Sequence, residues 1–241
     1  MLEAAGWAAL AASTLVLGAW LGAVRTASMR AVGLVMGFGA GALIASVSFE
    51  LTEDAFALNG TTTLALGLAL GALAFFVGDL RIDRMGGAQR KHAGGESGGE
   101  STALLLGATL DAIPESLILG LTVLVTGAPG ASFLVAVAVS NFPEGFASAA
   151  GMRRSGLRTR AIVASWGMIV ALSAACGALG YLVLGAADER AVAFVHAFGA
   201  GALLTMVMDT MAPEAYRDAG PLTGVVAVGG FAFAFLLGQV T

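Results

Sequence analysis

The sequence contains few charged residues and a single cysteine, and both scarcities narrow the class of protein. Charged residues make up 12% of its 241 residues, about half of the roughly 25% found in soluble domains. One cysteine, Cys176, excludes a disulfide framework or a cysteine metal site within one chain. The chain also lacks the G-x-x-x-x-G-K-[ST] motif of ATP-driven proteins and the H-E-x-x-H motif of zinc proteases.

In place of charge, the chain has long hydrophobic runs. Hydrophobic residues make up 58% of it and the mean hydropathy is +0.88. A membrane-spanning helix needs about 20 apolar residues, and eight windows qualify: about 5–24, 31–49, 62–80, 102–126, 131–151, 160–184, 190–211 and 220–239. These runs lack the period-two alternation of a barrel. We therefore predict an all-α integral membrane protein with eight transmembrane helices in a single domain over 1–241, and we interpret the first run as a helix, not a cleaved signal peptide.

The basic residues predict the orientation of these helices. Eleven of the twelve lie in or beside the loops after the first, third, fifth and seventh predicted helices, and only Arg190 lies on the other side. Cytoplasmic loops carry the excess of Lys and Arg, so both termini are expected outside, in a multi-pass protein of the cell membrane. The longest loop, 81–101, is rich in Gly, Ser and charge and is expected to be a flexible cytoplasmic segment.

Two segments of the chain resemble each other. "FGAGALIASVSFELTEDAF" (38–56) and "FGAGALLTMVMDTMAPEAY" (198–216) align at an offset of 160 residues and share their first six residues. The predicted orientation makes the two copies inverted, which favours a three-plus-two-plus-three arrangement of helices. Inverted repeats are typical of transporters, with the substrate site near the midplane.

Acidic residues lie next to prolines in the middle of two predicted helices. In "LDAIPES", Asp111 and Glu115 are four residues apart and share a helix face. In "VSNFPEG", Ser140 and Glu144 have the same spacing, with Asn141 beside them. Each proline frees a backbone carbonyl four residues back. Each motif therefore offers carbonyl oxygens beside carboxyl groups.

These acids are costly inside a membrane. Each costs about 2.5–3.5 kcal/mol on insertion scales, and no Lys or Arg is expected within a span core to neutralise them. Either they are protonated or a cation binds among them, and oxygen-rich sites suit hard or borderline divalent metals. The candidates to hold such a cation are the acids and their polar neighbours, Asp111, Glu115, Ser140, Asn141 and Glu144. Further candidate ligands are Glu50, Met208 and Asp209.

With these motifs the chain resembles the ZIP (Zrt-/Irt-like) family of divalent metal transporters, in its bacterial branch. The matching features are eight spans, outside termini, a hydrophilic loop after the third helix and Pro-Glu motifs on the fourth and fifth helices. The resemblance implies a transport site between those two helices, with metal ligands at Asp111, Glu115, Ser140 and Glu144. It also implies alternating access of the central helices and, in many members, a homodimer.

The chain departs from the family pattern at this site. The family's usual His-Asn-x-Pro-Glu reads Asp111-Ala112-Ile113-Pro114-Glu115 here, and the sixth predicted helix has no acid. In some bacterial members a second metal site uses a carboxylate from the sixth helix, so we expect a single site here, with oxygen ligands only. Such a site does not specify zinc: manganese, iron(II), a broader range of metals or a substrate other than a transition metal stay open.

The sequence as a whole predicts a secondary transporter, not an enzyme, that moves a divalent metal ion inward. The metal ion is its substrate, no cofactor is expected, and the lipid bilayer but no nucleic acid is a partner. Alternatives are a transporter or exporter of another cation or small solute on the same fold, an intramembrane enzyme, and a structural or signalling membrane protein.

Overall fold

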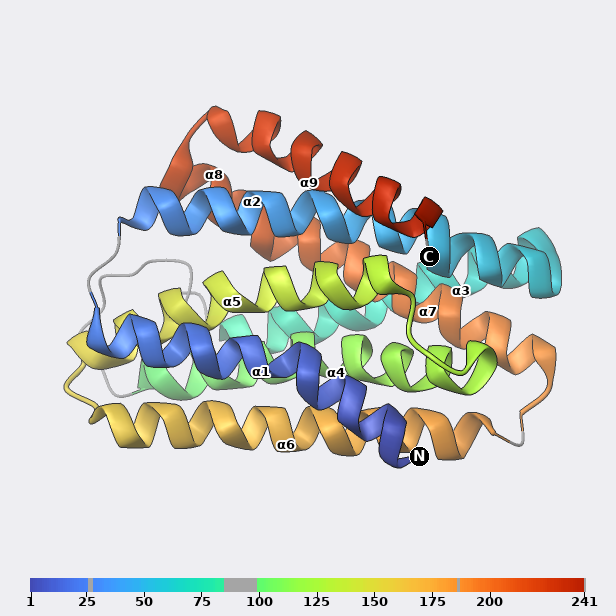
Figure 1. The fold of residues 1–241 in the computed structure, drawn as a ribbon, viewed down its shortest axis with the longest axis horizontal. Coiled ribbons are helices and arrows are strands. Elements are labelled where there is room, and N and C mark those ends of the chain that lie inside the picture. Colours follow the sequence, from blue (N-terminus) through green and yellow to red (C-terminus); the bar gives the residue numbers. More distant parts are fainter. Residues whose placement is uncertain (26–27, 85–98, 186, 241) are drawn as a thin grey trace.

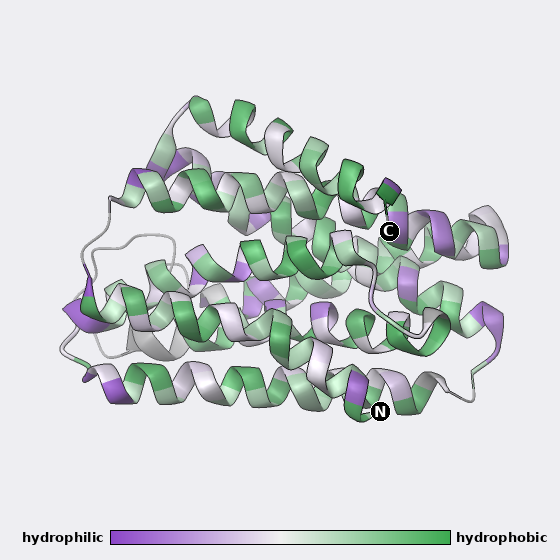
Figure 2. Ribbon diagram, in the orientation of Figure 1, coloured by the Kyte–Doolittle hydropathy of each residue, from purple (hydrophilic) through white to green (hydrophobic). Residues whose placement is uncertain are grey.

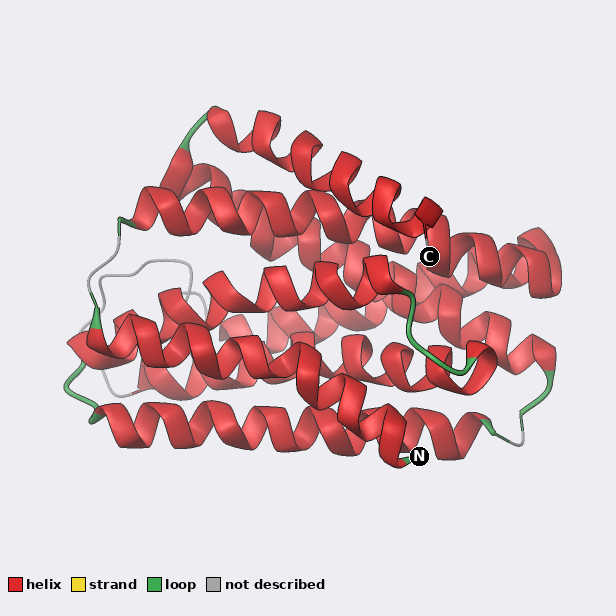
Figure 3. Ribbon diagram, viewed as in Figure 1, coloured by secondary structure: helices red, strands yellow, loops and turns green. Residues whose placement is uncertain are grey.

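Every element in the described part of the chain is a helix (Figure 1, Figure 3). The computed structural model describes residues 1–25, 28–84, 99–185 and 187–240. Its α-helices are α1 (Leu2–Val24), α2 (Met29–Ser46), α3 (Thr52–Arg84), α4 (Gly99–Thr126), α5 (Ala131–Arg154), α6 (Thr159–Leu184), α7 (Glu189–Met206), α8 (Ala212–Ala219) and α9 (Leu222–Val240).

Seven helical stretches of the described chain are long and apolar enough to cross a membrane. The predicted all-helical, multi-pass character is therefore confirmed at this level. Figure 2 shows the same property: the helices are mostly hydrophobic, and hydrophilic residues gather mainly near their ends. Both termini lie toward the same end of the bundle, the end at which α7 begins (Figure 1).

One of these stretches, Met29–Ile82, contains 54 residues and is divided near its middle. A straight helix of that length would measure about 80 Å, whereas the hydrocarbon core of a bilayer is about 30 Å thick. The break lies inside α3, where Asn59 (φ −146°, ψ 18°) and Gly60 (φ 70°, ψ −171°) leave helical geometry. Glycine adopts a positive φ without steric cost, so Gly60 permits the break. The predicted helices 31–49 and 62–80 lie on either side of it.

The helices extend into the predicted loop 81–101 from both ends. α3 continues to Arg84 and α4 begins at Gly99. Residues 85–98, the centre of the predicted flexible loop, lie outside the described residues.

The two similar segments share an unusual local structure. A π-helical turn joins α2 to α3 at Val47–Leu51, and a second joins α7 to α8 at Val207–Met211. The two turns are separated by the same 160 residues as the sequence repeat. Short π-helical turns are rare in helical proteins and often mark functional sites. The repeat is thus preserved in backbone geometry as well as in sequence.

Glycines bring the backbones of paired helices into direct contact. In the α2–α9 pair, Gly41 lies against the carbonyl of Ala227 and Gly230 lies against the carbonyl of Phe38. A β-carbon at either glycine would overlap that carbonyl oxygen. Small residues allow such close approach between membrane helices.

The α3–α7 pair repeats this contact. Gly201 lies against the carbonyl of Leu68, and Gly71 lies against the carbonyl of Phe198. Gly201 and Phe198 are the repeat counterparts of the residues that α2 uses. The six shared residues therefore make equivalent close contacts with a neighbouring helix in both copies.

The helices pack in two groups. α1 packs against α5 and α6, and α4 packs against α6, whereas α2 packs against α8 and α9, and α3 packs against α7. The contact between α2 and α5 joins the groups. There a β-carbon on Gly39 would lie 2.9 Å from the Cα of Ser140. This close contact brings α2 next to the polar segment of α5.

Adjacent glycines in α9 offer a matched test of this packing. We expect Gly230→Ala to destabilise the protein by about 1–3 kcal/mol, because its methyl group has no room against the Phe38 carbonyl. Gly229→Ala is the control, since a β-carbon there meets no atom within 4 Å, and it should change stability by less than about 0.5 kcal/mol. Thermal unfolding in detergent measures both. Equal stability of the two variants would contradict the described α2–α9 contact.

Candidate functional site

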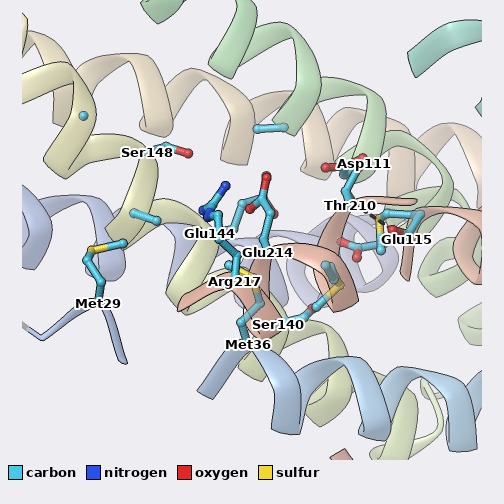
Figure 4. Close-up of a pocket in the computed structure, with 15 residues that line it drawn as sticks. Met29, Met36, Asp111, Glu115, Ser140, Glu144, Ser148, Thr210, Glu214 and Arg217 are labelled. Carbon is cyan, nitrogen blue, oxygen red and sulfur yellow. Dashed lines mark hydrogen bonds between the residues drawn. The ribbon is translucent and has the colours of Figure 1, made fainter. Parts of the chain in front are cut away.

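A cavity of about 80 Å³ lies between the two helix groups and is lined by most of the predicted site residues (Figure 4). Its volume suits a small cation with a few water molecules. Its polar and charged lining side chains are those of Asp111, Glu115, Ser140, Glu144, Ser148, Thr210, Glu214 and Arg217. The remaining lining residues are Met29, Met36, Ala108, Ala147, Gly151, Met206 and Met211.

α4 contributes two acids from successive turns. Asp111 and Glu115 both line the cavity, as their four-residue spacing predicts. Glu115 is buried, with 3% of its surface exposed. The two carboxyl groups interact electrostatically, so they repel each other when both are ionised. A cation between them would relieve that repulsion.

α5 contributes the facing wall. Ser140 and Glu144 line the cavity one turn apart, and Ser148 follows on the next turn. The Ser140 hydroxyl donates a hydrogen bond of 2.9 Å to the carbonyl of Val137. This bond uses the hydroxyl proton, so the lone pairs of the Ser140 oxygen can accept a donor or contact a cation.

The end of α7 and the segment after it supply a third wall, through residues that sequence reasoning did not select. Thr210 and Met211 from the π-helical turn line the cavity together with Met206 and Glu214. The Thr210 hydroxyl donates a hydrogen bond of 2.7 Å to the Met206 carbonyl. The internal repeat is the signal that could have identified this wall, because Thr210 is the counterpart of the candidate Glu50.

One basic side chain also lines the cavity. Arg217, in α8, reaches in beside Glu144 and Glu214 (Figure 4). No Lys or Arg was expected within a span core, and Arg217 lies two residues from the end of the Glu189–Ala219 stretch. Its long side chain nevertheless lines the cavity, which the sequence did not predict.

Asn141 lies elsewhere. Its side-chain amide is buried and donates a hydrogen bond of 3.4 Å to the carbonyl of Ala11 in α1. It is not among the residues that line the cavity. Successive residues of a helix point about 100° apart, so Asn141 faces α1 while Ser140 faces the cavity.

Met208 and Asp209 are exposed and do not line the cavity either. In a π-helical turn, hydrogen bonds link residues five apart instead of four. Met206 and Met211 accordingly line the same cavity. The residues between them that sequence reasoning selected face outward, and Met208 is 63% exposed.

Glu50 lies at a hydrogen-bonded junction near the start of α5. The hydroxyl of Ser132 donates to the Glu50 carboxyl group, and the hydroxyls of Ser132 and Ser46 are 2.7 Å apart. The carboxyl group also lies against Gly130. Ser132 is eight residues before Ser140, about 12 Å along a helix, so this junction is separate from the cavity.

An apolar layer separates the junction from the cavity. Along α5, the buried residues Phe133, Ala136 and Val137 lie between Ser132 and Ser140. All three belong to one hydrophobic cluster, in which α2 and α7 also take part through residues such as Leu43 and Leu203. In the described structure, buried apolar side chains thus fill the space between the cavity and the Glu50 junction.

The cavity extends toward the opposite end of the bundle. Met29 is the first residue of α2, and Gly151 lies in the last turn of α5. These helix ends lie at the same end of the bundle in Figure 1. The exposed basic residues at this end include Arg25, Arg81, Arg84, Arg153, Arg154 and Arg158. The cavity therefore opens toward the arginine-rich end.

The acids are distributed along the cavity. Among the described residues, no three His, Cys, Asp or Glu side chains lie close enough together to hold one metal ion. A cation in this arrangement would combine at most two carboxylates with hydroxyls, backbone carbonyls and water. Such mixed oxygen coordination is typical of hard cations that keep part of their hydration shell.

Comparison with known proteins adds no assignment. No protein-family model matches the sequence, and no curated protein matches it.

Two serines test the Glu50 junction. We expect Ser132→Ala to destabilise the protein by about 1–3 kcal/mol, because the hydroxyl bonds to both Glu50 and Ser46. Ser173→Ala should be neutral or stabilising, because the buried Ser173 hydroxyl has no hydrogen-bond partner in the described structure. Thermal unfolding of the two purified variants provides the comparison. A larger loss in Ser173→Ala than in Ser132→Ala would contradict the assigned bonds.

Proposed function

We propose that this protein is a secondary transporter that moves a divalent metal cation through the cavity between α4 and α5. The observation that carries the proposal is a cavity inside a multi-pass helical bundle lined by four carboxyl groups, one of them on the fully buried Glu115. Ionisable residues inside membrane proteins mark ion and substrate pathways, since they are too costly for a purely structural role.

We propose eight crossings with an internal inverted repeat, an arrangement that supports this function. The break at Asn59 and Gly60 divides the 54-residue stretch in two, and if each part crosses the membrane the seven stretches become eight crossings. The π-helical turns and the glycine contacts recur at the repeat offset. We propose the three-plus-two-plus-three arrangement on these grounds, with α4 and α5 as the central pair. Transporters with inverted repeats bind their substrates at such a central position.

Alternating access follows from the two helix groups. Within each group, glycines place one backbone directly against another, for example Gly18 against Phe142 in the α1–α5 pair. Between the groups, Gly39 lies against the backbone of Ser140, and elsewhere Gly78 and Gly199 meet the side-chain ends of Leu110 and Ile118. Flexible side chains can repack, whereas interlocked backbones cannot. We infer that α1, α4, α5 and α6 move as one body against the other helices.

The direction of transport follows from the two ends of the bundle. By the positive-inside rule, the arginine-rich end faces the cytoplasm. Both termini then lie on the outer side of the cell membrane. In that orientation the described cavity opens inward, and the apolar layer and the Glu50 junction close the outer side. We propose uptake as the direction, with Glu50, Glu53 and Asp54 forming an acidic outer surface that attracts cations.

Membership of the ZIP family is part of the proposal. The Pro-Glu motifs that carry the resemblance lie inside α4 and α5, with Pro114 and Pro143 within the helices, and Glu115 and Glu144 line one cavity. The homodimer that the resemblance implies stays a prediction.

The donor set favours a hard or borderline cargo. The lining acids and hydroxyls offer oxygen atoms, and the thioethers of Met29, Met36, Met206 and Met211 are the soft atoms present. Because no three acids converge, the cargo would retain water and exchange quickly. Manganese, iron(II) and zinc fit this description better than copper(I), which prefers sulfur ligands.

Uptake into liposomes tests the proposal. Reconstituted protein should take up at least one of Zn²⁺, Mn²⁺, Fe²⁺, Co²⁺ and Cd²⁺, and Glu144→Gln should reduce that uptake at least about tenfold, because a charge-assisted ligand is lost. Glu189→Gln is the control, since Glu189 is exposed in the first turn of α7 and does not line the cavity. Absence of uptake for every cation, or equal uptake by Glu144→Gln, would refute the proposal.

Uptake should also weaken as the medium becomes acidic. Protons and metal ions compete for the same carboxylate oxygens, so a protonated site binds the dication poorly. We expect the initial rate to fall as pH is lowered from about 7.5 toward about 5, the direction in which carboxyl groups gain protons. Initial rates at fixed membrane potential measure this effect. A rate independent of pH would exclude exchange of metal for protons at these acids.

A further inference from the structure

Arg217 is the one basic side chain among the described residues that line the cavity. The side chains of Arg217, Glu144 and Glu214 point toward one another in Figure 4, and Arg217 interacts electrostatically with Glu214. A guanidinium group stays charged under all ordinary conditions. The cavity therefore contains a permanent positive charge in the space proposed for a divalent cation.

A neighbouring aspartate holds this guanidinium in place. The Nε of Arg217 donates a hydrogen bond of 2.9 Å to Oδ1 of Asp218, and one terminal nitrogen lies 3.4 Å from Oδ2. Asp218 itself is 11% exposed and packs against α2, where a β-carbon on Gly33 would lie 2.9 Å from the Asp218 Cβ. Asp218 is thus an anchor that fixes where the guanidinium lies.

This anchor leaves donors for the cavity. A guanidinium carries five N–H donors in a planar fork, and the bonds to Asp218 occupy two of them. The other three can serve acceptors that line the cavity. The same side chain can therefore be anchored on one edge and face the acids with the other.

The internal repeat shows that this charge is specific to one end of the bundle. Glu214 has an acidic counterpart, Asp54, at the repeat offset, but the counterpart of Arg217 is Ala57. The end that carries Glu50 and Asp54 thus has acids without the matching arginine. The two copies share backbone geometry and differ in charge.

We propose that Arg217 is a tethered counter-cation, which balances the cavity acids when no metal is bound and repels the metal once it has arrived. This inference rests on the proposed transport function. In the empty state the positive charge of the guanidinium neutralises part of the negative charge of the acids, so a metal ion must compete with it for these acids. Once bound, the metal is repelled toward the arginine-rich end, which lowers affinity and speeds release there.

The test is a comparison of KM and maximal rate for metal uptake into liposomes. For Arg217→Gln, we expect KM to fall roughly threefold to tenfold, a modest range because the side chain is 41% exposed and partly screened by water. The maximal rate should fall as well, because release slows. Raising the salt concentration should shrink the difference from wild type, since salt screens charge.

Three variants separate this role from a structural one. Arg217→Lys keeps the charge and should keep KM within about twofold of wild type. Arg153→Gln removes an exposed arginine at the same end that does not line the cavity, and KM should not change. In a Glu214→Gln background, adding Arg217→Gln should again lower KM, which measures the effect even if the single Arg217→Gln variant does not fold.

The outcomes distinguish this inference from the transport proposal. A lower KM and lower maximal rate in Arg217→Gln, with Arg217→Lys near wild type, would support it. Wild-type uptake together with an unchanged or higher KM in folded Arg217→Gln, alone or in the Glu214→Gln background, would overturn the inference and leave the transport function standing. Absence of uptake in the wild type would overturn both.

Discussion

The negative charge of carboxyl groups inside a helical membrane bundle must be stabilised, and the rest of the structure depends on this requirement. An acid in hydrocarbon lacks the water that would stabilise its charge, so it must be neutralised, hydrated or paired. Here Asp111, Glu115 and Glu144 line a common cavity instead of facing lipid. Hydroxyls surround them, and one arginine approaches from the end of the bundle. The cavity is thus a small polar environment within an apolar protein, suited to a cation that can leave again.

The scaffold around this cavity depends on very close helix packing. Glycines in α2, α3, α7 and α9 bring backbones together, so each pair behaves as one rigid body. The two helix groups meet through side chains and through the small residues Gly39 and Ser140. A rigid interior for each group combined with an adaptable surface between them is what the proposed alternating access requires. The cavity lies between the groups, so the proposed movement would change its exposure.

Symmetry in the backbone and asymmetry in the side chains have separate consequences. The repeated segments form π-helical turns at equivalent positions, which gives each half of the bundle a similar wall. In one half the turn contributes Thr210 to the cavity, and in the other Glu50 bonds to Ser132 beyond an apolar layer. A cation transported as proposed would therefore meet different charges at the two ends. Such a difference would make capture stronger at one end and release faster at the other.

The sequence by itself determined the helical class, the span positions and four of the cavity residues, because hydrophobic run length and four-residue spacing are local properties. The sequence also predicted separate helices over 31–49 and 62–80, but the structure alone shows that helix continues between them up to a break at Asn59 and Gly60. Only the tertiary structure decided which candidates share the cavity. Asn141 faces α1, Met208 and Asp209 face outward because of a π-helical turn, and Arg217 and Glu214 enter from a distant segment. Spacing along one helix fixes relative direction, but the identity of the neighbour depends on how separate helices pack.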